Sequence, residues 1–153
     1  MAENLKLARL YLLLLAIFTV GKFVQGALGV PYEKGHYVFS IVIMTIHAGI
    51  FYGAFCRRWR RYRLWQSAGL AITLGLISQV VIFVATLASY ALGLHTYFNH
   101  PRVLNAEMEL SMNEALTLRA FGLVGGPIEN GAAAFLGWLI GGVLPERKGP
   151  APV

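Results

Sequence analysis

The chain has 153 residues, of which 57% are hydrophobic and 13% charged, with a mean hydropathy of +0.61 and a net charge of +6. Soluble domains carry about 25% charged residues, so this composition excludes an ordinary water-soluble domain and indicates a protein whose surface is largely covered by lipid. The single cysteine, Cys56, excludes an internal disulfide and a CxxC redox pair.

The first apolar segment runs over about 7–30 and is long enough to span a membrane. Its start also has the pattern of a signal peptide, with Lys6 and Arg9 ahead of the apolar run, but Glu3 and Lys22 argue against cleavage. We therefore expect a retained helix. Lys22 and Gln25 are spaced i and i+3, so they share one face of that helix.

The second and third apolar segments, about 37–56 and 64–94, are separated by a short basic stretch. This arginine block consists of Arg57, Arg58, Arg60, Arg61 and Arg63. Basic loops of membrane proteins lie on the cytoplasmic side, so the block predicts a cytoplasmic turn. The same side chains are candidates to hold an anionic lipid headgroup.

The fourth segment, about 127–144, follows a long connection. Ser111 and Glu114 form a capping-box pattern that favours a helix from about Met112. We expect an external interfacial or re-entrant helix over about 103–124. Gly125 to Pro127 predicts a break, after which a new helix N-terminus would present free N–H groups beside Glu129 and Asn130.

Together these segments predict an all-α integral membrane protein, a four-helix bundle with both termini in the cytoplasm. Nine of the thirteen Lys and Arg residues then lie on the cytoplasmic side. We assign residues 1–148 to one transmembrane domain and 149–153 to a flexible tail. Compact size and the absence of an organelle-targeting segment favour the inner membrane of a bacterium.

Polar residues of different predicted helices lie at similar depths in the membrane. At ~1.5 Å per residue from the cytoplasmic charges, Lys22 lies ~20 Å deep, Gln79 ~24 Å deep and Glu129 ~26 Å deep. Gln25 and Asn130 belong to the same layer, and His47 lies nearer mid-membrane. A lysine in hydrocarbon needs a partner or water, so we expect Lys22 and Glu129 to form an ion pair or share a ligand in an outer polar pocket. The alternative is that Lys22 extends to the outer headgroups.

Small residues indicate how the helices associate. Gly49 and Gly53 form one GxxxG pair, and Gly137 and Gly141 form another. In lipid, such pairs allow close backbone contact between helices. The sequence leaves open whether these contacts lie within one chain or join the chains of a homo-oligomer.

No cofactor is identified by the sequence. Haem held by two histidines is not expected, because His47 has no second histidine at its depth. His36, His95 and His100 could meet near Glu33, but their spacing matches no compact metal motif, so the site prediction includes no metal. The basic residues follow the topology and do not predict nucleic-acid binding. There is no P-loop, HExxH, nucleophile elbow or Rossmann glycine pattern.

Three functional hypotheses follow. The first is a small polytopic protein that binds, or also transports, a small molecule or ion at the outer polar pocket. Its candidate ligand-binding residues are Lys22, Gln25, His47, Gln79, Glu129 and Asn130. The second is an accessory or assembly subunit of a larger membrane complex. The third is a membrane-embedded enzyme for a lipid-soluble substrate, with His47 or Glu129 as acid or base.

Overall fold

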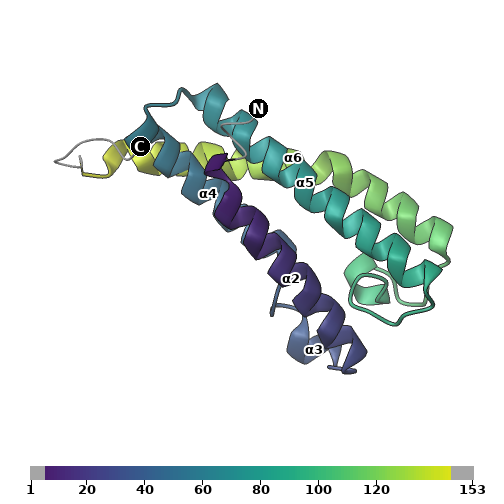
Figure 1. The fold of residues 1–153 in the computed structure, drawn as a ribbon. Coiled ribbons are helices and arrows are strands. Elements are labelled where there is room, and N and C mark those ends of the chain that lie inside the picture. The colour runs from purple at the N-terminus through teal and green to yellow at the C-terminus, as the bar shows by residue number, and fades with distance from the viewer. Residues whose placement is uncertain (1–5, 146–153) are drawn as a thin grey trace.

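The computed structural model describes residues 6–145, and every regular element in that part of the chain is helical, which confirms the all-α class. The predicted tail 149–153 lies outside the described residues. In chain order the elements are α2 (Arg9–Ala27), α3 (Tyr32–Gly35), α4 (Ile41–Arg60), α5 (Leu64–Ala91), the 3-10 helix η1 (Pro101–Leu104) and α6 (Met112–Val143) (Figure 1).

Three of the described helices, α2, α5 and α6, are long and apolar enough to cross a membrane. At about 1.5 Å per residue, their 19, 28 and 32 residues give axial lengths of roughly 28, 42 and 48 Å, against ~30 Å of hydrocarbon. The fourth long helix, α4, has 20 residues, but Arg57, Arg58 and Arg60 occupy its last turn. Composition therefore supports three spans directly, and a crossing by α4 stays a prediction.

Helices α4, α5 and α6 form the closely packed part of the molecule, and α6 contacts both of the others extensively. The contact between α4 and α6 depends on glycine. A Cβ atom built on Gly137 would lie 2.0 Å from the carbonyl oxygen of Ile50, and one on Gly53 would lie 2.3 Å from that of Ala134. Only residues without a side chain allow the two backbones to approach this closely.

Both GxxxG pairs take part in this contact. Gly49 faces Asn130 of α6, and Gly141 faces the backbone of Ala54 in α4. All four glycines are buried. The glycine faces that were candidates for a homo-oligomer are therefore covered by the chain's own helices. Along α4 and α6 the numbers of the contacting residues rise together, so the two helices run parallel.

Helix α6 is continuous from Met112 to Val143, with Pro127 in its interior. The predicted break before Pro127, with its separate outer helix and fresh N-terminus, is therefore wrong. Pro127 removes one backbone hydrogen bond, and the ribbon changes direction near the middle of α6, as expected of a proline kink (Figure 1). Such a residue is tolerated in a membrane helix because neighbouring helices support the weakened turn.

The start of α6 follows the capping box. The backbone N–H of Ser111 donates to Glu114 Oε2 at 2.9 Å, and the N–H of Glu114 donates to Ser111 Oγ at 3.4 Å. This pair confirms the predicted helix start at Met112. Residues 105–111, which the sequence placed in a helix over about 103–124, are not helical.

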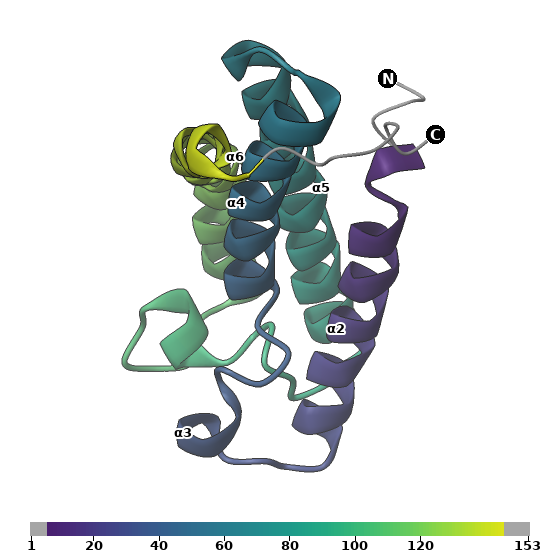
Figure 2. The same cartoon turned by 90° about the vertical axis from the view of Figure 1, so that its left-hand side faces the viewer.

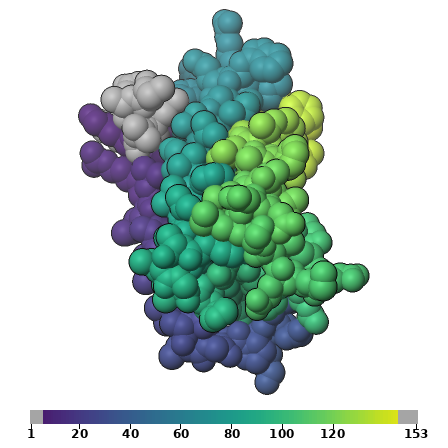
Figure 3. Space-filling model, turned by 90° about the vertical axis from the view of Figure 1, so that its right-hand side faces the viewer, coloured from purple at the N-terminus to yellow at the C-terminus, as the bar shows by residue number. Residues whose placement is uncertain are grey.

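Helix α2 lies on the flank opposite to α6 (Figures 2 and 3). Its contacts with α4 and α5 are far fewer than those that α4 and α5 make with α6. Near its start, the hydroxyl of Tyr11 lies 2.9 Å from Thr45 Oγ1 and donates to the carbonyl of Leu74 at 3.3 Å. Near its end, a Cβ atom on Gly26 would meet the backbone of Thr96 at 2.6 Å. Between these two points Leu15 is buried and Phe18 packs edge-on against Phe39, but α2 makes few close backbone contacts with α4 and α5.

The two ends of the bundle differ. Figure 2 shows α3 and the connection between α5 and α6 together at one end, and the turn between α4 and α5 at the other. We call these the α3 end and the arginine end. At the arginine end, Arg61 has a φ of 55°, a left-handed conformation that terminates α4 just before the turn.

Candidate functional site

Lys22 is the most deeply buried charged residue described, with 7% of its surface exposed. Its ammonium group donates to the carbonyl oxygens of Gly35 at 2.9 Å and His36 at 3.0 Å, and lies 4.4 Å from the centre of the Tyr97 ring. The predicted ion pair with Glu129 is therefore wrong, because backbone carbonyls of the α3 segment and an aromatic face surround the charge. The alternative prediction, in which the Lys22 side chain extends to the outer headgroups, does not agree with the structure either, because the side chain is buried under the α3 segment.

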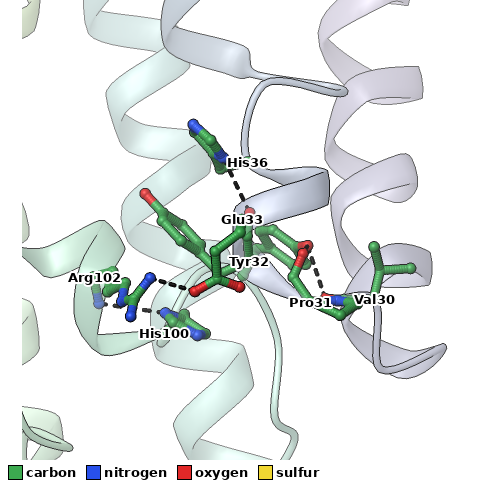
Figure 4. A network of polar contacts seen from close by, with 8 residues as sticks. Val30, Pro31, Tyr32, Glu33, His36, His100 and Arg102 are labelled. Carbon is green, nitrogen blue, oxygen red and sulfur yellow. Dashed lines mark hydrogen bonds and ion pairs between the residues drawn. The ribbon is translucent and has the colours of Figure 1, made fainter.

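The segments that surround Lys22 form a cap, which we define as residues 30–36 and 97–105. Tyr97 joins its two halves by donating to the carbonyls of Val30 at 2.8 Å and Pro31 at 3.0 Å. An ion pair between Glu33 and Arg102 joins them again (Figure 4). A hydrogen bond from its own backbone N–H and the charge of Arg102 lower the pKa of Glu33, so the pair is charged at neutral pH.

Aromatic stacking also holds the cap together. The ring of Tyr32 lies between those of His36 and His100, at centroid distances of 5.0 and 4.8 Å (Figure 4). Burial and the nearby charge of Arg102 lower the pKa of His100, so its imidazole is neutral at pH 7. The cap is thus an ordered layer of rings and carbonyls over the α3 end.

A second cation, Arg119 of α6, lies beside the same space and was not identified from the sequence. Its Nε donates to Thr86 Oγ1 at 3.2 Å and its terminal nitrogen donates to the Phe98 carbonyl at 3.0 Å. The sequence signal was present, because Arg119 is the only basic residue of α6. The expected helix break hid that signal, since it placed Arg119 in an outer helix and not in a span.

Lys22 and Arg119 face one cavity of about 300 Å³ that is lined by residues of α2, α4, α5, α6 and the cap. Its lining comprises the basic side chains Lys22, Arg102 and Arg119, the tyrosines Tyr32, Tyr37 and Tyr97, and apolar side chains that include Ile41, Ile82 and Val103. Among the described residues, none that lines this cavity is acidic. Arg102 is neutralised by Glu33, which leaves Lys22 and Arg119 as two uncompensated positive charges.

The expected polar layer divides into two. Gln79, Glu129 and Asn130 line a different cavity, of about 10 Å³, which is room for one water molecule. Asn130 is 1% exposed; its Nδ2 donates to the Ala71 carbonyl at 2.7 Å, while its Oδ1 has no partner among the described residues. Glu129 is exposed and lies ten residues from Arg119, about 15 Å along α6.

Gln25 and His47 lie apart from both cavities. Gln25 is half-buried on α2, and its Oε1 has no hydrogen-bond partner in the described part of the chain. His47 is exposed, with Nδ1 2.8 Å from the carbonyl of Ile43, and lines an apolar groove between α2 and α4. The six predicted ligand-binding residues therefore do not converge on one site.

The histidines that raised the question of a metal do not assemble a ligand set. His36 and His100 stack on Tyr32, and His95 is exposed. Within residues 6–145, no three His, Cys, Asp or Glu side chains are grouped so that they could hold a metal ion.

The arginine block divides into packed and exposed members. Arg57 donates to the Trp138 carbonyl at 2.8 Å with its guanidinium carbon 3.7 Å from the centre of the Trp138 ring, and Arg58 donates to the Pro145 carbonyl at 3.1 Å. Arg60, Arg61 and Arg63 are exposed. The first two therefore fasten α4 to the end of α6, and the lipid-headgroup role stays a prediction for the others.

Comparison of the chain with family models, with curated proteins and with solved structures finds no match in any of the three. The chemistry of the cavity is therefore the basis for a functional assignment.

Proposed function

We propose that this protein is a four-span membrane protein that binds a small anionic molecule in the cavity between Lys22 and Arg119. In this proposal the arginine end is cytoplasmic, which places the cavity at the outer side of the bilayer. Transport of the ligand would require a second opening toward the arginine end, so binding is the activity that we assign.

The observation that carries the proposal is the pair of cations without a carboxylate. Burying an uncompensated charge in a membrane protein is costly, and such residues are usually paired or functional. Lys22 uses two of its three N–H donors in the bonds to Gly35 and His36, and Arg119 uses two of its five in the bonds to Thr86 and Phe98. The remaining donors are available to a ligand that supplies negative charge.

The tyrosines add polar contacts beside the charges. The rings of Tyr32 and Tyr97 line the cavity, and Tyr97 is fixed by its bonds to the cap. Carboxylates and phosphates accept several hydrogen bonds at once, which suits an ammonium, a guanidinium and the Tyr32 phenol around one space, while the Tyr97 ring contributes only a wall. The enzyme hypothesis has less support, because neither His47 nor Glu129 lines this cavity.

The proposal is tested with purified protein in a non-ionic detergent. Inorganic phosphate, acetate, hexanoate and decanoate are added at constant ionic strength, set with chloride, and the shift in unfolding temperature is measured. We expect at least one anion to stabilise the wild type, and Lys22→Gln and Arg119→Gln each to weaken that binding about tenfold or more.

Lys6→Gln is the matched control, since Lys6 is exposed and lies at the opposite end of α2. It removes the same charge from the chain and should leave the shift unchanged. Anion binding at this cavity would be rejected if the anions stabilised all three variants equally. It would also be rejected if none of the four anions stabilised the wild type.

A further inference from the structure

The cationic cavity lies next to a second space. An apolar groove of about 440 Å³ lies between α2 and α4, and three residues, Tyr37, Ser40 and Ile43, line both the cavity and the groove. The groove therefore lies beside the cavity that Lys22 and Arg119 face, with these three residues at their common border. The cavity and the groove are neighbouring spaces of opposite character, one charged and one apolar.

The groove has the shape of an extended chain. Along α4 its lining reaches from Ile43 to Tyr52, nine residues or about 14 Å. A volume of about 440 Å³ over that length gives a cross-section of roughly 31 Å², about 6 Å across. A groove of these dimensions has room for one extended hydrocarbon chain.

The lining of the groove is suited to hydrocarbon. Leu10, Leu14 and Phe18 of α2 form one wall, and Phe51 belongs to the other. Its polar groups are largely engaged within the protein: the Tyr11 hydroxyl with Thr45, and His47 Nδ1 with the Ile43 carbonyl. A saturated chain would therefore displace no hydrogen bond on entering.

We propose that the ligand is an anionic amphiphile, a molecule with one carboxylate or phosphate headgroup and one extended acyl chain. The headgroup binds Lys22 and Arg119, and the chain lies in the groove between α2 and α4. This inference rests on the proposed anion binding and adds the class of ligand. Apolar surface alone gives little preference for one chain over surrounding lipid, so the charged headgroup supplies the affinity and the groove selects for a single chain.

Two independent features of the fold favour this arrangement. The sparse contact of α2 with α4 and α5 leaves the groove open along its length, whereas α4 and α6 leave no such space. Leu10 and Phe51 are 66% and 57% exposed, so the groove is reached from the lipid-facing surface. An amphiphile could enter laterally from the membrane, without opening the cap.

The experiment uses decanoate that carries a photoreactive diazirine at the end of its chain, with full-length protein in a non-ionic detergent. Labelled residues are mapped by mass spectrometry of peptides. We expect labelling of the groove residues around Phe51 and Leu10, competition by decanoate, and at least tenfold weaker competition by acetate or by neutral decanol. Arg119→Gln should reduce labelling about tenfold or more.

Ala48→Phe fills the groove from α4, and Leu14→Trp fills it from α2, so a failure of one variant to fold leaves the other as the test. Both should reduce labelling near Phe51. Ala132→Phe, at an exposed alanine of α6 away from the groove, is the matched control and should label as the wild type does. Size-exclusion profiles and helix content identify folded variants.

The outcomes separate the two proposals. Suppose that Arg119→Gln abolishes anion binding. If acetate then competes as well as decanoate, or if the folded groove-filling variants are labelled like the wild type, the acyl chain is not in the groove and only this inference fails. If labelling near Phe51 survives in both Lys22→Gln and Arg119→Gln, or decanol competes as well as decanoate, the cations do not recognise the headgroup and this inference fails. Both proposals fail only if, in addition, neither variant weakens the binding of the small anions.

Discussion

The contact of α4 with α6 and the contact of α2 with α4 and α5 are built on opposite principles. Between α4 and α6, glycines bring backbone against backbone, so that a Cβ atom on Gly137 or Gly53 would overlap a carbonyl oxygen. Between α2 and its neighbours, aromatic and long side chains hold the helices apart and leave a groove and a cavity. In lipid, where burial from water does not drive association, close packing stabilises the bundle and incomplete packing leaves room for a ligand.

The largest effect is expected from opening the closely packed side. Gly137→Leu places a side chain where Cβ alone would lie 2.0 Å from the Ile50 carbonyl oxygen, so α4 and α6 must separate. We expect a loss of about 3 kcal/mol in the free energy of unfolding, the upper range for overpacking. This loss is measured by unfolding the protein in SDS and monitoring its helix content.

Gly69→Leu is the matched control, because a Cβ atom at Gly69 of α5 would meet nothing within 4 Å. The same substitution there should be nearly neutral. If the two variants unfolded at the same SDS fraction, the α4–α6 glycines would not be the source of close packing.

The closely packed side was also the more predictable one. The spacing of Gly49 with Gly53, and of Gly137 with Gly141, identified both contact faces without reference to their partners. Three of the four predicted spans lie on helices long and apolar enough to cross a membrane, and the Ser111 capping box located the start of α6. These features are local, since each is encoded within a few residues of the helix that carries it.

The site was less predictable, because its partners are not local. Backbone carbonyls hold Lys22, and carbonyls leave no mark in a sequence. Counting residues gave the depth of Lys22 and Glu129 but not the direction in which each side chain points. The string Gly125 to Pro127 is compatible with both a break and a kink, and choosing the break placed Arg119 outside the membrane.

A smaller effect is expected from loosening the open side. Tyr11→Phe keeps the aromatic ring at position 11 of α2 but removes the hydroxyl that contacts Thr45 and the Leu74 carbonyl. We expect a loss of about 1 kcal/mol in the free energy of unfolding, the usual contribution of one hydrogen-bonding group. SDS unfolding measures the loss, and hydrogen exchange should show faster amide exchange in α2 than in α6.

Tyr62→Phe is a suitable control, since no hydrogen bond from the Tyr62 hydroxyl is found among the described residues, while its backbone carbonyl accepts from Trp138. Faster amide exchange in α6 than in α2 after the Tyr11 substitution would contradict the view that α2 is held less tightly than α6.

The smallest expected effect concerns pH and the cap that covers the open side. The pKa of His100 lies below its ordinary 6.5, mainly through burial, and that of Glu33 lies below 4.5, through its own backbone N–H and Arg102. A group whose pKa is lower in the folded protein than in the unfolded chain stabilises the folded cap at any pH above its unfolded pKa. This stabilisation is lost as the pH falls from the unfolded pKa to the folded pKa. The cap should therefore weaken first below pH 6.5 and again below pH 4.5.

Hydrogen exchange of residues 30–36 between pH 7 and pH 4, corrected for the intrinsic rate, measures this weakening. His100→Gln should remove the step below pH 6.5 and keep the lower one, because Glu33 and Arg102 remain. The amides of α4 that face α6 should show neither step, since within residues 6–145 no ion pair joins these two helices. Greater protection of residues 30–36 in acid would mean that these two groups do not hold the cap.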